Sequence, residues 1–180
     1  VDFGSTDIVN GGGLFTLSDD ATLQTANPTG INGSIQTSTR SLSTLANYCF
    51  DGIASQVTGS YLPATINSLT IDNPAGVMLT NSVTTSGTLN LNSGTLNLNG
   101  KTLTIPASGL VSCGGGSING NAGSSVIFNN TAPTSFPSGT YQNVTLNTPG
   151  GVTMCGNASV NGTMTMTSGK VVFNSSDEQK

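Results

Sequence analysis

Three consecutive seven-residue units limit the fold of this chain more than any other feature: GTLNLNS (87–93), GTLNLNG (94–100) and KTLTIPA (101–107). In each unit, polar and apolar positions alternate, as a β-strand with one buried side requires. The apolar positions are Leu89, Leu91, Leu96, Leu98, Leu103 and Ile105. Strands this short cannot bury a face alone, and a single Gly does not supply the turn chemistry for successive tight hairpins. We therefore predict a β-solenoid, in which each coil stacks on the next.

The spacing of the inward pairs sets the size of the coil. The pairs Leu69/Ile71, Val77/Leu79, Val83/Thr85 and Leu89/Leu91 follow one another at steps of eight, six and six residues. Later steps are seven residues each. The fold class predicted is therefore all-β, a right-handed parallel β-helix with about 20–21 residues per three-sided coil. With about 4.8 Å between stacked strands, some nine coils would form a rod on the order of 40 Å long.

An antiparallel β-sandwich is the structural alternative. It requires two-residue turns, and Asn-Gly occurs at 10–11, 32–33, 99–100, 119–120 and 161–162. We expect segments 19–33, 50–64 and 129–140 to form protruding loops or irregular corners, because they break the alternation. The segment SLSTLANY (41–48) is the only candidate helix.

A long internal repeat organises the chain. Residues 67–94 align without a gap with residues 142–169, so that Thr70 and Pro74 recur as Thr145 and Pro149. We read the chain (1–180) as a single solenoid domain made of two long repeats, about 11–98 and 99–174. The polar end SSDEQK (175–180) is a candidate to cover one open edge.

The composition argues against several classes of function. Only 7% of the residues are charged, the net charge is −4 and His is absent. There is no basic surface for nucleic acid or anionic lipid, and no apolar run long enough for membrane insertion. Without His, a Ser-His-Asp triad is excluded. We therefore expect no enzyme, no cofactor and no metal site, since zinc-site spacing and the Gly-Gly-x-Gly-x-Asp calcium repeat are both missing.

A polysaccharide lyase or hydrolase remains as a minor alternative, since a groove could gather Asp51, Asp72 and Arg40. The glycines at 11–13 and 114–116 are expected at corners that need positive φ. Cys49, Cys113 and Cys155 leave at least one thiol unpaired within the chain, and their spacing does not decide which pair, if any, is bridged.

The outward polar positions form the one candidate binding surface. On a solenoid, outward residues of successive coils stack into ladders, and Thr suits such positions because of its β-propensity. A regular uncharged lattice could also bind ice or the hydroxyl-rich face of a glycan. The ladder residues predicted are Thr88, Asn90, Thr95, Asn97, Thr102, Thr104, Thr163 and Thr165. Against ice, Thr-x-Thr occurs in few places, among them 102–104 and 163–167, whereas other strands carry Asn.

The segments 64–105 and 34–63 carry a family resemblance. ATINSLTIDNPAGVMLTNSVTTSGTLNLNSGTLNLNGKTLTI resembles the repeats of very large secreted surface proteins of Bacteroidetes, which are adhesin-like and exported by the type IX pathway. The resemblance implies a β-solenoid stalk, exposure outside the cell, and a role in adhesion or surface coating. The sorting domain of that family is missing from this chain.

These observations favour a structural and adhesive role: a non-catalytic β-solenoid segment of a secreted bacterial cell-surface or fibre protein. Exposed strand edges at the ends could pair with another copy, so the expected partners are the chain itself, by end-to-end or lateral assembly, or a glycan or other surface. The alternative from another class is an ice- or carbohydrate-binding module that uses an outward Thr/Asn face.

Overall fold

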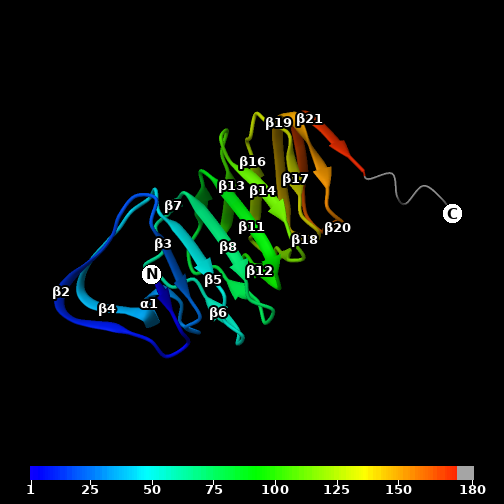
Figure 1. Ribbon diagram of the computed structural model, residues 1–180. Coiled ribbons are helices and arrows are strands. Elements are labelled where there is room, and N and C mark those ends of the chain that lie inside the picture. The colour runs from blue at the N-terminus through cyan, green and yellow to red at the C-terminus, as the bar shows by residue number, and fades with distance from the viewer. Residues whose placement is uncertain (174–180) are drawn as a thin grey trace.

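The chain folds into a parallel β-solenoid of about eight turns, with 2% of its residues in helix. The computed structural model describes residues 1–173. Figure 1 shows the strands stacked in layers along one axis, with the first and last described strands at opposite ends of the stack. Every strand pair in the described chain is parallel, from β1 with β3 to β19 with β21. The predicted fold class is confirmed, and the antiparallel sandwich is wrong.

Three sheets form the sides of the coil. Sheet I contains β1 (Asp2–Phe3), β3 (Thr22–Thr25), β5 (Asn47–Phe50), β8 (Ser68–Asp72), β11 (Thr88–Ser93) and β14 (Leu110–Cys113). Sheet II contains β6 (Gln56–Val57), β9 (Val77–Met78), β12 (Thr95–Asn97), β15 (Ser117–Asn119), β18 (Gly139–Tyr141) and β20 (Ala158–Val160). Sheet III contains β7 (Thr65–Ile66), β10 (Val83–Thr85), β13 (Thr102–Ile105), β16 (Ser125–Phe128) and the first parts of β19 (Asn143–Met154) and β21 (Met164–Val172). The later parts of β19 and β21 continue around the corner, where β17 (Thr134–Phe136) pairs with β19 and lies beside β14.

The register between strands matches the predicted coil length. Leu89 pairs with Leu69, 20 residues earlier, in sheet I. In sheet II, Leu96 pairs with Val77, 19 residues earlier. Apolar residues therefore fall above apolar residues from turn to turn, and alternation places all of them on the inner side of the sheets.

The core fills the inside of the coil over the whole length of the stack. Its members run from Phe3 to Val152 and include every inward residue predicted from the seven-residue units. Those six are fully buried: Leu89, Leu91, Leu96, Leu98, Leu103 and Ile105. Near the C-terminal end the core becomes aromatic, where the ring of Phe136 lies 5.4 Å from that of Phe128 and 5.0 Å from that of Tyr141.

The part that projects from the stack is a two-stranded ribbon at the N-terminal end. β2 (Val9–Leu17) pairs in parallel with β4 (Ile35–Leu42), outside the three sheets. Figure 1 shows the two strands as a curved ribbon at one end. The loops expected at 19–33, 50–64 and 129–140 instead contribute β3, β6 and β17 to the coil. The expectation is wrong for these strands, whereas most of the remaining residues of the three segments form irregular corners, as expected.

The only helix among the described residues is the four-residue α1 (Ile31–Ser34), so the helix predicted at 41–48 is wrong. Residues 43–46 form a turn there, in which the Ser43 hydroxyl accepts a hydrogen bond from the Leu45 amide at 2.9 Å. Ser competes with helical hydrogen bonding in this way. The chain then enters β5, which pairs with β3 on one side and β8 on the other.

The sequence repeat is not in phase with the coil. Leu69 and Val144 occupy the same position of the 75-residue repeat, yet Leu69 lies in sheet I and Val144 lies in sheet III. Likewise, Asn90 of sheet I corresponds to Thr165 of sheet III. One repeat therefore does not span a whole number of turns. It covers several turns and ends one side before the last turn is complete. The division into repeats 11–98 and 99–174 stays a prediction, and residues 174–180 lie outside the described chain.

A buried polar cluster holds the corner between sheets I and II. The Gln56 side chain, 2% exposed, donates to the carbonyls of Thr25 (2.8 Å) and Asn27 (3.0 Å). Its oxygen accepts from the Gly52 amide (2.8 Å) and from the Asn73 side chain (2.7 Å). All four hydrogen-bonding positions of this amide are thus used, and they tie together three successive turns.

Candidate binding surfaces

The predicted ladder residues lie on three different sides of the solenoid. Thr88 and Asn90 project from sheet I, Thr95 and Asn97 from sheet II, and Thr102 and Thr104 from sheet III. Thr165 lies in β21 on sheet III, and Thr163 immediately precedes that strand. No single surface therefore holds the eight residues together, because the seven-residue step moves the chain from one side to the next.

Sheet III carries a ladder that sequence reasoning did not assemble. Its register places five threonines and one isoleucine in one continuous outward row, which we call the sheet III ladder. The row consists of Thr65, Thr84, Thr104, Ile127, Thr145 and Thr165. Only Thr104 and Thr165 were predicted. The signal that could have found the others is the recurrence of Thr at one coil length, rather than at seven residues.

The hydroxyls of the sheet III ladder have no hydrogen-bond partner within residues 1–173. The other two sheets differ. On sheet II the hydroxyls of Thr95 and Ser117 lie 3.0 Å apart, and on sheet I the Asn90 side chain donates to the Thr70 hydroxyl at 3.2 Å. The ladder hydroxyls are therefore available to an external partner, whereas several polar groups on the other sheets bond to one another.

A second polar row lies beside the ladder. Thr102 pairs with Ser125, and Ser125 pairs with Asn143. The Asn143 side chain accepts from the Thr163 amide at 3.2 Å, which continues the row to the last turn. Along each row the groups repeat at about 4.8 Å, and between rows, two residues apart on a strand, at about 6.7 Å. Sheet III therefore presents a two-dimensional polar lattice, and its strands contain no charged residue before Lys170.

Charge gathers on sheet I instead. The carboxylate of Asp51 accepts from the Gln24 side chain at 2.6 Å, and that of Asp72 accepts from the Ser93 hydroxyl at 2.9 Å. Arg40 lies with its guanidinium carbon 3.8 Å from the centre of the Tyr61 ring, and it donates to the Thr37 carbonyl. No ion pair joins Arg40 to either aspartate within the described residues. Arg40 lies in β4 of the N-terminal ribbon, whereas both aspartates lie at sheet I, and the lyase or hydrolase alternative stays a prediction.

The same region contains the free thiol. Burial, and then the nearby carboxylates of Asp51, Asp72 and Asp2, raise the pKa of Cys49 to about 12. The thiol is therefore neutral at physiological pH and a poor nucleophile or metal ligand. Among residues 1–173 no group of three His, Cys, Asp or Glu side chains is placed to hold a metal ion.

The other two cysteines form a disulfide between Cys113, at the end of β14, and Cys155, just after β19. The sequence left this pairing open. The glycines beside it do not adopt positive φ, contrary to expectation. The reason for glycine is proximity: the amides of Gly114, Gly115 and Gly116 all donate to the Leu91 carbonyl, and a Cβ on Gly114 would lie 2.8 Å from the Asn92 Cα.

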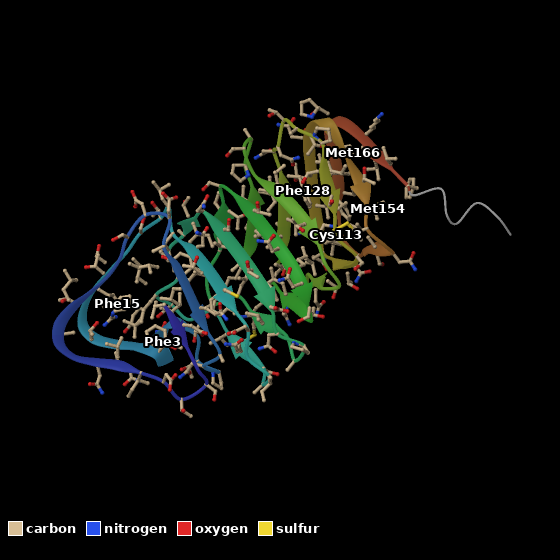
Figure 2. The ribbon with its side chains drawn as sticks, in the orientation of Figure 1. Phe3, Phe15, Cys113, Phe128, Met154 and Met166 are labelled. Atoms are coloured by element: carbon tan, nitrogen blue, oxygen red, sulfur yellow. A yellow bond between two sulfur atoms is a disulfide. The ribbon has the colours of Figure 1, made fainter. Side chains whose placement is uncertain are left out.

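The C-terminal end of the stack is a second exposed surface of distinct chemistry. Apolar side chains of the last turn surround an open hollow of about 360 Å³. Its lining includes Phe136, Met154, Val160, Met166, Val171 and Phe173. Figure 2 shows Met154 and Met166 at this end and Phe3 and Phe15 at the other.

Comparisons with known proteins give no match: no family model fits the sequence, and no curated protein or solved structure is detectably similar. Within residues 1–173 no helix has the length and apolarity needed to cross a membrane.

Proposed function

We propose that this chain is a non-catalytic structural and adhesive segment of a secreted, cell-surface or fibre protein. The observation that carries the proposal is the uninterrupted apolar core beneath three parallel sheets, from Phe3 to Val152. Each turn of such a stack rests on its neighbours, which gives a stiff spacer whose length follows the number of turns. The resemblance of residues 34–105 to secreted adhesin-like repeats points the same way.

The disulfide between Cys113 and Cys155 supports a location outside the cytoplasm, because disulfides persist mainly in oxidising compartments. The test is to extract the protein from its own cells in denaturant that contains an alkylating reagent. Mass spectrometry of the intact protein then counts the alkylated cysteines. We expect one adduct, at Cys49, and three adducts when a reductant is added before alkylation. Three adducts without reductant would place the protein in a reducing compartment and refute the extracellular role.

The sheet III ladder favours a second candidate function, binding to the surface of ice. The polar groups of the two rows repeat regularly along the stack and across it. The water molecules of an ice surface also repeat regularly in two directions, so many contacts could form at once. Each threonine of the ladder carries one methyl and one hydroxyl group, and no member of the row is charged. The objection from the sequence was that Thr does not recur in successive coils; on sheet III it does so at five of six positions. A glycan is less favoured, because the row carries no aromatic side chain to stack on a sugar ring.

Thermal hysteresis of the purified chain tests this candidate. We expect Thr104→Tyr and Thr145→Tyr to abolish it, because a bulky ring would keep the rest of the lattice from the ice surface. Thr88→Tyr is the matched control, since Thr88 projects from sheet I. Absence of hysteresis in the unmodified chain would remove this candidate, and binding on a glycan array would replace ice by carbohydrate.

A further inference from the structure

The last turn of the solenoid leaves uncovered the apolar positions that every earlier turn buries. Met164 pairs with Val144 and Met166 pairs with Leu146, so both methionines continue inward rows of the core. Val144 and Leu146 are 1% and 0% exposed, whereas Met164 and Met166 are 43% and 49% exposed. The difference arises because no described strand lies above β21.

The backbone at this end is also without partners. Among the described residues, β20 pairs only with β18, and β21 pairs with β19. The outer edges of both strands therefore present free N–H and C=O groups, which are a template for another strand. An occupant of this end must supply both an apolar surface and strand edges. Residues 174–180 (NSSDEQK) contain no apolar side chain and cannot supply that surface.

The N-terminal end does not offer the complementary surface. There the β2–β4 ribbon covers the stack, and Phe3 and Leu17 are 8% and 5% exposed. β2 contains three consecutive exposed glycines, Gly11 to Gly13. Stacking of the C-terminal end on the N-terminal end of another copy would leave the methionines against this glycine-rich ribbon, in which Leu14 is the large apolar side chain that is exposed.

We infer that the C-terminal end binds the same end of a second copy, in a dimer with two-fold symmetry. Such a contact is isologous, so each apolar patch covers its own counterpart. The two-fold axis makes the β21 strands antiparallel. Because directly opposed residues of an antiparallel pair point to the same side, inward residues must oppose inward residues. Centring the pair on Thr165 places Met164 of each copy opposite Met166 of the other.

The contact area limits the affinity. A coil of about 20 residues at roughly 3.3 Å per residue encloses a cross-section well below the ~800 Å² per partner of a standard interface, so we expect dissociation in the micromolar range. The hydrophobic contribution comes from the two methionines and Phe173, and the antiparallel ladder adds hydrogen bonds. This inference does not depend on the cellular compartment or on the spacer role.

Sedimentation velocity of the 180-residue chain over a concentration series tests the dimer. We expect a monomer–dimer equilibrium that Met166→Asp weakens at least ~100-fold, because the new carboxylate would be buried without a partner. Leu14→Asp is the control, because Leu14 is 63% exposed in the N-terminal ribbon. A contact between two C-terminal ends does not include Leu14, so we expect the dissociation constant to change by less than about twofold. Far-UV circular dichroism confirms that each variant is folded.

Three results would overturn the inference. One is a monomer at all concentrations. Another is loss of association in Leu14→Asp, which would show head-to-tail stacking. The third is a longer polypeptide, extended beyond residue 180, that stays monomeric, which would make attached chain the occupant of this end.

The register has its own test. Thr165→Cys in a Cys49→Ser background should form an intermolecular disulfide on mild oxidation, because opposed Cβ atoms lie within about 5.5 Å. Thr140→Cys, on the outer side of sheet II, should not. A dimer that fails to cross-link at position 165 would refute the antiparallel pairing centred there.

Discussion

Replacing Gln56 by Leu should destabilise the fold strongly, although the two side chains have similar size. The substitution leaves no large cavity, so its effect isolates the polar cluster at the corner of sheets I and II. Two donors lose their only available partner there: the Gly52 amide and one N–H of the Asn73 side chain. The carbonyls of Thr25 and Asn27 lose one hydrogen bond each but keep backbone partners in Asp51 and Gly30.

The magnitude follows from these partners. Each buried donor left unpaired costs about 1–3 kcal/mol, and each lost carbonyl hydrogen bond costs about 1 kcal/mol. Burial of the more apolar Leu offsets ~2 kcal/mol of this cost. The expected net loss in the free energy of unfolding is about 2–6 kcal/mol.

Urea unfolding followed by circular dichroism, without reductant, measures this loss. The matched control is Gln24→Leu, since Gln24 lies on the outer side of sheet I and makes one side-chain hydrogen bond, to Asp51. We expect the control to cost less than about 1 kcal/mol. If both variants have the same stability within error, the corner cluster does not hold the turns together as argued.

Three further outcomes follow from the core, the disulfide and the buried titrating groups. Leu96→Ala, at a fully buried position, should lower the free energy of unfolding by about 2–5 kcal/mol in the same urea assay. Reduction of the bond between Cys113 and Cys155, 42 residues apart, should cost up to about 4 kcal/mol in that assay, and no change would contradict a loop-closure contribution. Burial raises the pKa of Cys49 from 9.0, and that of Tyr48 from 10.0, to about 12 in each case. Because the unfolded chain releases these protons first, these two groups should leave the stability unchanged well below pH 9 and lower it between pH 9 and 12. Melting temperatures that stay level across this range would refute the burial of both groups.

The sequence predicted the sheets well because alternation is local. Leu96 and Leu98 are separated by one polar residue, and any strand that buries one of them buries the other. The coil length followed from the same pattern, since inward pairs must stack on one another. The corners carried no such signal. Gln56 and Asn73 are buried only because three turns meet around them. From the sequence alone, a polar residue where the polar/apolar alternation is interrupted predicts a loop.

The candidate surface was harder to predict than the core. Thr88, Thr95 and Thr102 share one local pattern, but each lies on a different side of the coil. Thr84 and Thr145 share the sheet III ladder although their local sequences differ. Which outward residues become neighbours depends on the lengths of all the intervening corners, and these vary from turn to turn.

The 75-residue repeat does not correspond to a whole number of turns, and this limits how the row of threonines on sheet III could have arisen. Copying a 75-residue block carries each outward residue onto an adjacent side, so duplication spreads an existing row around the rod and does not lengthen it. The repeat counterparts of Thr145 and Thr165 are Thr70 and Asn90, which project from sheet I. Duplication of this block therefore did not place these threonines in one row on sheet III, because their repeat counterparts lie on another side of the rod.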